Sequence, residues 1–92
     1  MPSSSELAAE LRVALPATVA LHARPAGVFV REAARLPADV TVSANGRVAR
    51  AKSILEVLSL GAEGGTELLL SGSGESAAEA VERLAAVIRE LA

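Results

Sequence analysis

The sequence predicts a two-layer α+β domain, an open-faced sandwich in which three helices cover one face of a four-stranded antiparallel sheet. Three observations support this prediction. Strand and helix patterns follow one another in the order β-α-β-β-α-β-α. Asn45-Gly46 is a strong signal for a tight hairpin between two strands. Two longer segments, residues 25–36 and 77–91, have apolar side chains at three- and four-residue spacings, so each presents one face to a core.

The first strand is followed by a loop and a helix. Residues 10–15 alternate apolar and other side chains, which indicates a strand with one buried face. Pro16 ends this strand, and residues 16–21 form a loop. From Pro25 to Leu36 the apolar spacing is helical. Proline is favoured in the first turn of a helix, so this helix begins close to Pro25.

A hairpin follows the first helix. Residues 40–44 alternate as a half-buried strand, and residues 47–50 form the return strand. Asn45-Gly46 separates the two, and a type I′ turn requires positive φ at both central residues, which asparagine and glycine tolerate. We therefore expect these strands to be antiparallel neighbours.

The last three elements are a short helix, a strand and a long helix. Ser53-x-x-Glu56 and Ser76-x-x-Glu79 both have the spacing of a capping box, in which the serine caps a helix N-terminus. Gly61 then ends the short helix. The predicted elements are, in order, a helix over residues 54–60, a strand over 66–71, a turn at 72–74 and a helix over 77–91.

The composition is that of one small domain. A chain of 92 residues can bury one modest core, and a hydrophobic share of 51% excludes a disordered protein. The polar start of the chain predicts a flexible N-terminal extension over residues 1–9 and one domain over residues 10–92.

Composition also excludes several functional classes. The absence of cysteine excludes thiolate metal sites, and one histidine cannot form a histidine cluster, so we expect no metal or cofactor. A net charge of −2 and a single aromatic residue give no nucleic-acid surface. No apolar segment is long enough to span a membrane, and no signal peptide is recognisable, so we expect a cytoplasmic protein without membrane insertion.

The only histidine lies next to an arginine at a predicted helix N-terminus. His22 precedes Pro25 closely, and Arg24 lies between them. A helix N-terminus carries a partial positive charge and free N–H groups, so cationic side chains are unfavourable there. Such a break of a local rule often marks a functional site. The arrangement is favourable when an anion binds.

The chemistry that follows is nucleophilic. Because the helix end disfavours a positive charge, we expect His22 to be neutral, with a lone pair available to attack a phosphoryl donor. The helix N–H groups and Arg24 can then bind the negative charge of the product. The alternative is that His22 is an ordinary loop or capping residue and Arg24 a solvated surface charge.

The short helix is apolar on too many sides to be buried entirely. We assign Val57 and Leu60 to the core, which leaves Ile54, Leu55 and Leu58 as an exposed apolar patch of the kind that binds partners. The alternative is a helix packed deeply enough to bury all five side chains. On the first helix, Arg31 and Arg35 form a solvated face that can also steer an acidic partner.

Two motifs identify a family. Leu21-His22-Ala23-Arg24-Pro25-Ala26 resembles the signature of HPr, the histidine-containing phosphocarrier family of the bacterial phosphoenolpyruvate:sugar phosphotransferase system. Residues 51–61 are similar to the regulatory-serine helix of that family, and Asn45-Gly46 lies where the family has a hairpin turn. The resemblance extends from Val13 to Leu91, nearly the whole chain.

The resemblance implies a strand order of 1-4-2-3 and a phosphocarrier function. It implies that His22 accepts a phosphoryl group from phosphorylated enzyme I and passes it to enzyme IIA domains, with Arg24 stabilising the phosphate. The carrier would not be an enzyme, and the first two helices would form its docking face. A monomer is the simplest expectation for its oligomeric state. An HPr kinase would phosphorylate Ser53 in organisms that have one.

The chain also departs from the family pattern. Arg50 replaces a residue that is often small or polar, and Glu56 occupies a position that is often glycine. The loop over residues 16–21 is about two residues longer than is common. Two other functions stay open. One is a regulatory module of the same fold that acts in carbon or nitrogen control by docking alone, and the other is a structural α+β domain.

Overall fold

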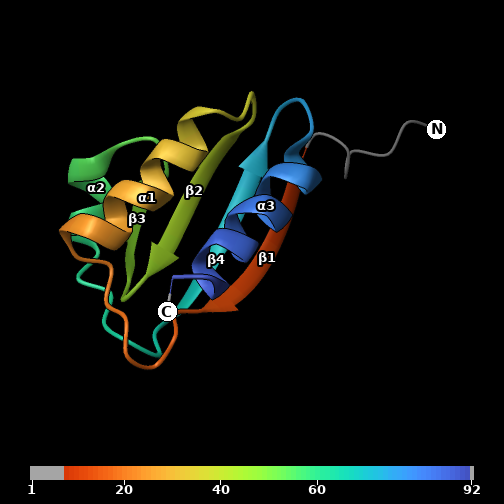
Figure 1. Cartoon of the computed structure of the whole chain (residues 1–92). Coiled ribbons are helices and arrows are strands. Elements are labelled where there is room, and N and C mark those ends of the chain that lie inside the picture. Colours follow the sequence, from red (N-terminus) through yellow and green to blue (C-terminus); the bar gives the residue numbers. More distant parts are fainter. Residues whose placement is uncertain (1–7, 92) are drawn as a thin grey trace.

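The computed structural model describes residues 8–91, and its elements follow the predicted order (Figure 1). The strands are β1 (Ala8–Ala14), β2 (Asp39–Ala44), β3 (Arg47–Arg50) and β4 (Glu67–Ser73). The helices are α1 (Ala23–Ala34), α2 (Ile54–Ser59) and α3 (Ala77–Arg89).

The four strands form one sheet in the order β1-β4-β2-β3, and every neighbouring pair is antiparallel. Figure 1 shows α1 and α3 side by side across one face of this sheet, with α2 near the β3 edge. The predicted fold class and strand order are therefore confirmed. In this order β4 lies between β1 and the β2–β3 hairpin.

The core lies between the sheet and the helices. Its largest fully buried side chain is Phe29 of α1, which is surrounded by aliphatic residues from every layer. Close packing of α3 on β4 depends on Gly72, because a Cβ there would lie 3.0 Å from Cγ1 of Val81 and 3.1 Å from the carbonyl oxygen of Ala77. The fully buried large side chains are Phe29, Leu15, Leu21, Leu60, Leu68, Leu70, Leu84, Ile88, Val42 and Val57.

The strands β1 and β4 are longer than predicted. β1 begins at Ala8, two residues before the expected start, since Ala8 and Ala9 pair with Ser73 and Gly72. The turn predicted at residues 72–74 therefore begins later, after Ser73. Within the predicted N-terminal extension, residues 1–7 lie outside the described residues.

The predicted cap at Ser76 is wrong. Ser76 precedes α3 but has φ +61°, and its side chain makes no capping hydrogen bond. A capping serine needs an extended backbone to direct its hydroxyl at the first free N–H groups, and the left-handed conformation removes that geometry. The helix begins instead with the backbone bond from Ala80 N–H to the Ser76 carbonyl, 2.9 Å long.

Candidate functional site

His22 is the N-cap residue of α1. Its backbone is extended, with φ −90° and ψ −168°, and its carbonyl oxygen accepts the N–H of Ala26 at 2.8 Å, the first hydrogen bond of the helix. The His22 side chain makes no capping bond and is exposed. The imidazole is therefore accessible to a partner, while the backbone that carries it is fixed by the start of a helix.

The residues before His22 hold it from the other side. Leu21 is buried, and its N–H donates to the carbonyl of Ala62 at 2.9 Å. The N–H of His22 itself donates to the carbonyl of Ala20 at 2.9 Å. A buried neighbour and these two bonds direct the chain so that residue 22 faces solvent.

The helix end beside His22 is electropositive. α1 begins at Ala23, two residues earlier than predicted, so Pro25 is the third helical residue, where a missing N–H costs nothing. The N–H groups of Ala23 and Arg24 belong to the same first turn, and no acidic residue lies in it. Arg24 is exposed, and within residues 8–91 it has no ion pair. The end of α1 can therefore bind an anion with donors from both backbone and side chain.

Ser53 caps α2, as predicted. Its Oγ accepts the N–H of Glu56 at 3.3 Å, and its extended backbone, with φ −110°, is suitable for a cap. The second half of the predicted capping box is wrong, because the Glu56 carboxylate does not bond to the N–H of Ser53. That N–H donates to the carbonyl of Arg50 at 3.0 Å.

The Glu56 carboxylate is bound by Arg50 at the end of β3. The backbone N–H of Arg50 donates to Oε1 at 2.8 Å, and its Nε donates to Oε2 at 2.8 Å. Nη2 of Arg50 also donates to Oε2. The hydrogen bonds from Arg50 lower the pKa of Glu56, and Glu56 raises the pKa of Arg50 in turn. Two of the residues expected from the sequence to depart from the family pattern are thus partners.

The apolar patch on α2 is exposed, as predicted. Val57 and Leu60 are buried, whereas Leu55 is 77% exposed and Ile54 and Leu58 are each 38% exposed. The alternative, in which all five side chains are buried, is wrong. α2 is too short and lies too near the edge of the sheet for more than one of its sides to face the core. We call Ile54, Leu55 and Leu58 the α2 patch.

The structure brings the predicted site residues onto adjacent helices. α1 and α2 are in contact, and the bond from Leu21 to Ala62 places His22 near the C-terminal end of α2. Ser53 lies at the opposite end of this six-residue helix, about 9 Å along its axis. The α2 patch lies between the two ends. His22 and Ser53 therefore flank the patch and do not contact each other in a common pocket.

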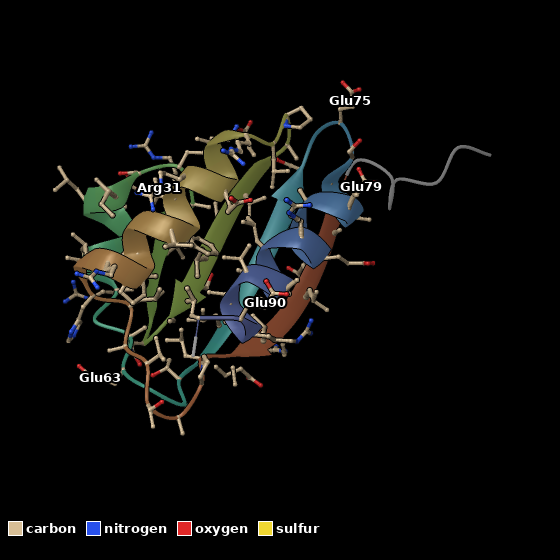
Figure 2. The ribbon with its side chains drawn as sticks, viewed as in Figure 1. Arg31, Glu63, Glu75, Glu79 and Glu90 are labelled. Atoms are coloured by element: carbon tan, nitrogen blue, oxygen red, sulfur yellow. The ribbon has the colours of Figure 1, made fainter. Side chains whose placement is uncertain are left out.

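Charge is distributed unevenly over the molecule. Residues 24–56 carry six basic and three acidic side chains, whereas residues 62–91 carry two basic and six acidic ones. All three acids of the first segment are paired, Glu32 with Arg35 and Arg83, Asp39 with Lys52, and Glu56 with Arg50. Figure 2 shows Arg31 on α1, away from Glu75, Glu79 and Glu90 on and around α3. The α1–α2 side is therefore the more positive one.

The side-chain contacts of the β2–β3 hairpin with α2 could not be found from the sequence. Asn45 and Arg47 donate to carbonyl oxygens at the C-terminal end of α2, and Arg50 binds its N-terminal end. The only signal was the unusual residue types at positions 50 and 56. Residues 8–91 contain neither a cluster of metal-ligating side chains nor a helix long and apolar enough to cross a membrane.

Comparison with known proteins agrees with this geometry. Residues 9–90 match the family model described as the PTS HPr component phosphorylation site. Phosphocarrier protein HPr of Vibrio cholerae is 44% identical over 82 residues, which cover 89% of this chain and 96% of the relative. HPr-like protein Crh of Bacillus subtilis is 46% identical over 70 residues, 76% of this chain and 82% of the relative. The crystal structure of a phosphocarrier protein HPr from Bacillus anthracis superposes with a TM-score of 0.84 at 36% identity, covering 89% of this chain and 98% of that one.

Proposed function

The chain belongs to the HPr family, the phosphocarrier proteins of the phosphoenolpyruvate:sugar phosphotransferase system, and we propose that His22 is the residue that carries the phosphoryl group. One observation supports this assignment above the others. The only histidine of the chain is exposed at the N-terminus of a twelve-residue helix whose first turn holds no acidic residue. An imidazole that can act as a nucleophile and the N–H donors of a helix end therefore occur at one place.

The transfer step uses the lone pair of the unprotonated imidazole nitrogen. This nitrogen forms a bond to phosphorus while the bond between phosphorus and the donor, phosphorylated enzyme I, breaks. The phosphoryl oxygens then lie beside the N–H groups of Ala23 and Arg24 and the Arg24 guanidinium, all of which donate to anionic oxygen. In a second transfer, a nucleophile of an enzyme IIA domain forms a bond to phosphorus while the bond between phosphorus and His22 breaks. The protein therefore carries a covalent intermediate and turns over no small molecule.

Docking uses the α2 patch next to His22. Its exposed side chains offer apolar surface, and the positive α1–α2 side, with Arg24 and Arg31, favours an acidic partner surface. Membership of the HPr family implies that the partners are enzyme I and the enzyme IIA domains. A cytoplasmic location is part of the same proposal, because both partners act on the cytoplasmic side of the system.

Ser53 is the proposed regulatory site, for a cell that has an HPr kinase. Its hydroxyl already serves as a helix cap, and Glu56 lies within the same turn, so a phosphate would meet a neighbouring carboxylate. Arg50 offsets this repulsion by pairing with Glu56. The proposal therefore requires Arg50 to neutralise the carboxylate next to the modified serine.

A second candidate function is regulation through docking without phosphoryl transfer. The similarity to HPr-like protein Crh of Bacillus subtilis favours it, since that relative carries a name separate from the phosphocarriers. The presence of His22 and Arg24 in this chain favours the phosphocarrier. Both functions would use the α2 patch, so they differ in what happens at His22.

The test is a phosphorylation assay with mass spectrometry. The purified chain is incubated with enzyme I and phosphoenolpyruvate, and a mass gain that is acid-labile and base-stable identifies phosphohistidine. His22→Ala should abolish this gain while circular dichroism shows an unchanged fold, because the side chain is exposed. Labelling of the variant would contradict the assignment of His22. Enzyme I binding without any labelling of the wild type would favour the second candidate.

A further inference from the structure

The tip of the β2–β3 hairpin contacts the C-terminal end of α2. Asn45 and Gly46 have φ +55° and +74°, the left-handed pair that a type I′ turn requires. In this conformation the Asn45 side chain points at the adjacent helix end. Its Nδ2 donates to the carbonyl oxygens of Leu60 at 3.1 Å and Gly61 at 3.3 Å.

Leu60 is the C-cap residue of α2 and Gly61 follows it, so both carbonyls lie beyond the hydrogen bonds of the helix itself. The last carbonyl groups of a helix have no intrahelical partner, and a helix of six residues is too short to be stable alone. Arg47 adds a neighbouring bond, from Nη1 to the carbonyl of Ser59 at 3.3 Å. At the opposite end Arg50 binds Glu56. The hairpin therefore holds α2 at both ends.

The carbonyl that follows these two belongs to Ala62, and it accepts the N–H of Leu21, the residue before His22. Ala62 and Leu21 are both buried, so this bond is shielded from solvent. Asn45 therefore binds the carbonyls of Leu60 and Gly61, and the next carbonyl, that of Ala62, binds the N–H of the residue before His22. A shift of residues 60–62 would move the α2 patch and His22 relative to each other.

We propose that Asn45 is a positioning residue for phosphoryl transfer, acting through residues 60–62 on both the α2 patch and His22. The inference rests on the proposed role of His22. Asparagine is required here for two reasons. It tolerates positive φ, and its amide group has two N–H donors for two carbonyl acceptors. Glycine satisfies the first requirement and aspartate tolerates the same backbone, but neither supplies the donors.

Two substitutions in the same turn separate the amide from the turn itself. Asn45→Gly keeps the backbone conformation and removes the amide. Gly46→Ala keeps the amide and strains the backbone at φ +74°, where the added Cβ meets nothing within 4 Å. The measurements are kcat and KM for phosphorylation by enzyme I, hydrogen exchange of the Leu21 amide, and thermal unfolding of the same samples.

Asn45→Gly should lower kcat/KM by about two- to tenfold, the range that a net hydrogen bond gives in an equilibrium constant. It should also speed exchange of the Leu21 amide. Gly46→Ala should leave kcat/KM within about twofold of wild type, even if it lowers the melting temperature by as much as Asn45→Gly does. If Asn45→Gly does not fold, Asn45→Asp is expected to show the same losses.

Two results would overturn the proposal. One is unchanged kcat/KM and unchanged Leu21 exchange in Asn45→Gly. The other is an equal loss of transfer in both variants, because the amide would then matter only through stability. A wild-type chain that accepts no phosphoryl group would instead contradict the proposed function of His22. In that case Leu21 exchange still decides whether Asn45 is coupled to the His22 backbone.

Discussion

Replacing Leu55 by glutamate tests whether the α2 patch binds a partner. Leu55 is the most exposed large hydrophobic residue in the described part of the chain, with 77% of its surface accessible to solvent. A charge at this position meets water in the free protein, so the fold should be retained. In a complex with enzyme I the same charge would replace an apolar contact and would face the acidic surface expected of the partner.

The expected magnitude follows from the exposed area. Burying a whole leucine side chain contributes about 1.5–3 kcal/mol, and about three quarters of Leu55 is still available for burial by a partner. Losing that contact costs about 1–2 kcal/mol, or about 5- to 30-fold in Kd. Stability should change by less than about 0.5 kcal/mol, as is usual for surface substitutions.

The assay is calorimetric titration with enzyme I, together with thermal unfolding. Val57→Ala is the matched control, since Val57 lies two residues away on the same helix and is fully buried. It should lower stability by about 1–3 kcal/mol while the folded fraction binds nearly as wild type does. Unfolding of Leu55→Glu would place Leu55 in the core. An unchanged Kd would refute the docking role of the α2 patch.

Substitutions at three further positions have expected outcomes. Arg24→Ala should slow single-turnover transfer from enzyme I tenfold or more, which corresponds to about 1.4 kcal/mol of activation barrier, and Arg24→Lys should recover part of the lost rate. A large loss of stability with an unchanged transfer rate would make Arg24 a structural residue. Glu56→Gln should lower stability at neutral pH. The difference from wild type in urea unfolding should begin to shrink below the usual glutamate pKa of about 4.3 and vanish as the pH falls through the lowered pKa of Glu56. The direction of this pH dependence follows from the lowered pKa of Glu56, because the ionised carboxylate stabilises the fold above the unfolded-state pKa and this stabilisation is lost on protonation. A stability difference that does not depend on pH would exclude the ion pair with Arg50 as its cause. Ser53→Ala should lower the melting temperature by about 2–8 °C through loss of the helix cap. An unchanged melting temperature in calorimetry would show that the 3.3 Å hydrogen bond from Glu56 N–H to Ser53 Oγ contributes nothing to stability.

The elements of the fold could be predicted because each depends on local patterns. The type I′ turn requires positive φ at Asn45 and Gly46, and asparagine and glycine are the residue types that tolerate it, so the sequence predicts the turn directly. The Ser53 cap likewise lies within one helical turn of its donor. Helical geometry predicted that Val57 and Leu55 lie on different sides of α2, and the choice of Val57 for the core is confirmed by its burial.

The errors and omissions arise where a side chain has a choice of partners. Glu56 could have bonded to the N–H of Ser53, but Arg50 offers its guanidinium group and its backbone N–H. The hydrogen bonds from these donors are together stronger than one bond from a neutral donor. Ser76 has the spacing of a capping box, but the turn after β4 places it in the left-handed region. Both outcomes depend on how β3 and β4 end, which no window of sequence around these residues contains.

The exposure of His22 and Arg24 is suited to a carrier. Ion pairs and hydrogen bonds at a solvent-exposed helix end are weakened by water, so the proposed phosphorylated state of His22 would be stabilised only modestly. A buried pocket with the same donors would bind the phosphate more strongly and would make onward transfer slower. The empty first turn of α1 has the opposite effect, since no carboxylate of its own must be displaced before the group arrives. If His22 carries the phosphoryl group as proposed, an exposed site of this kind would keep both transfers close to balance, which is the requirement for a protein that accepts a phosphoryl group from one partner and gives it to another.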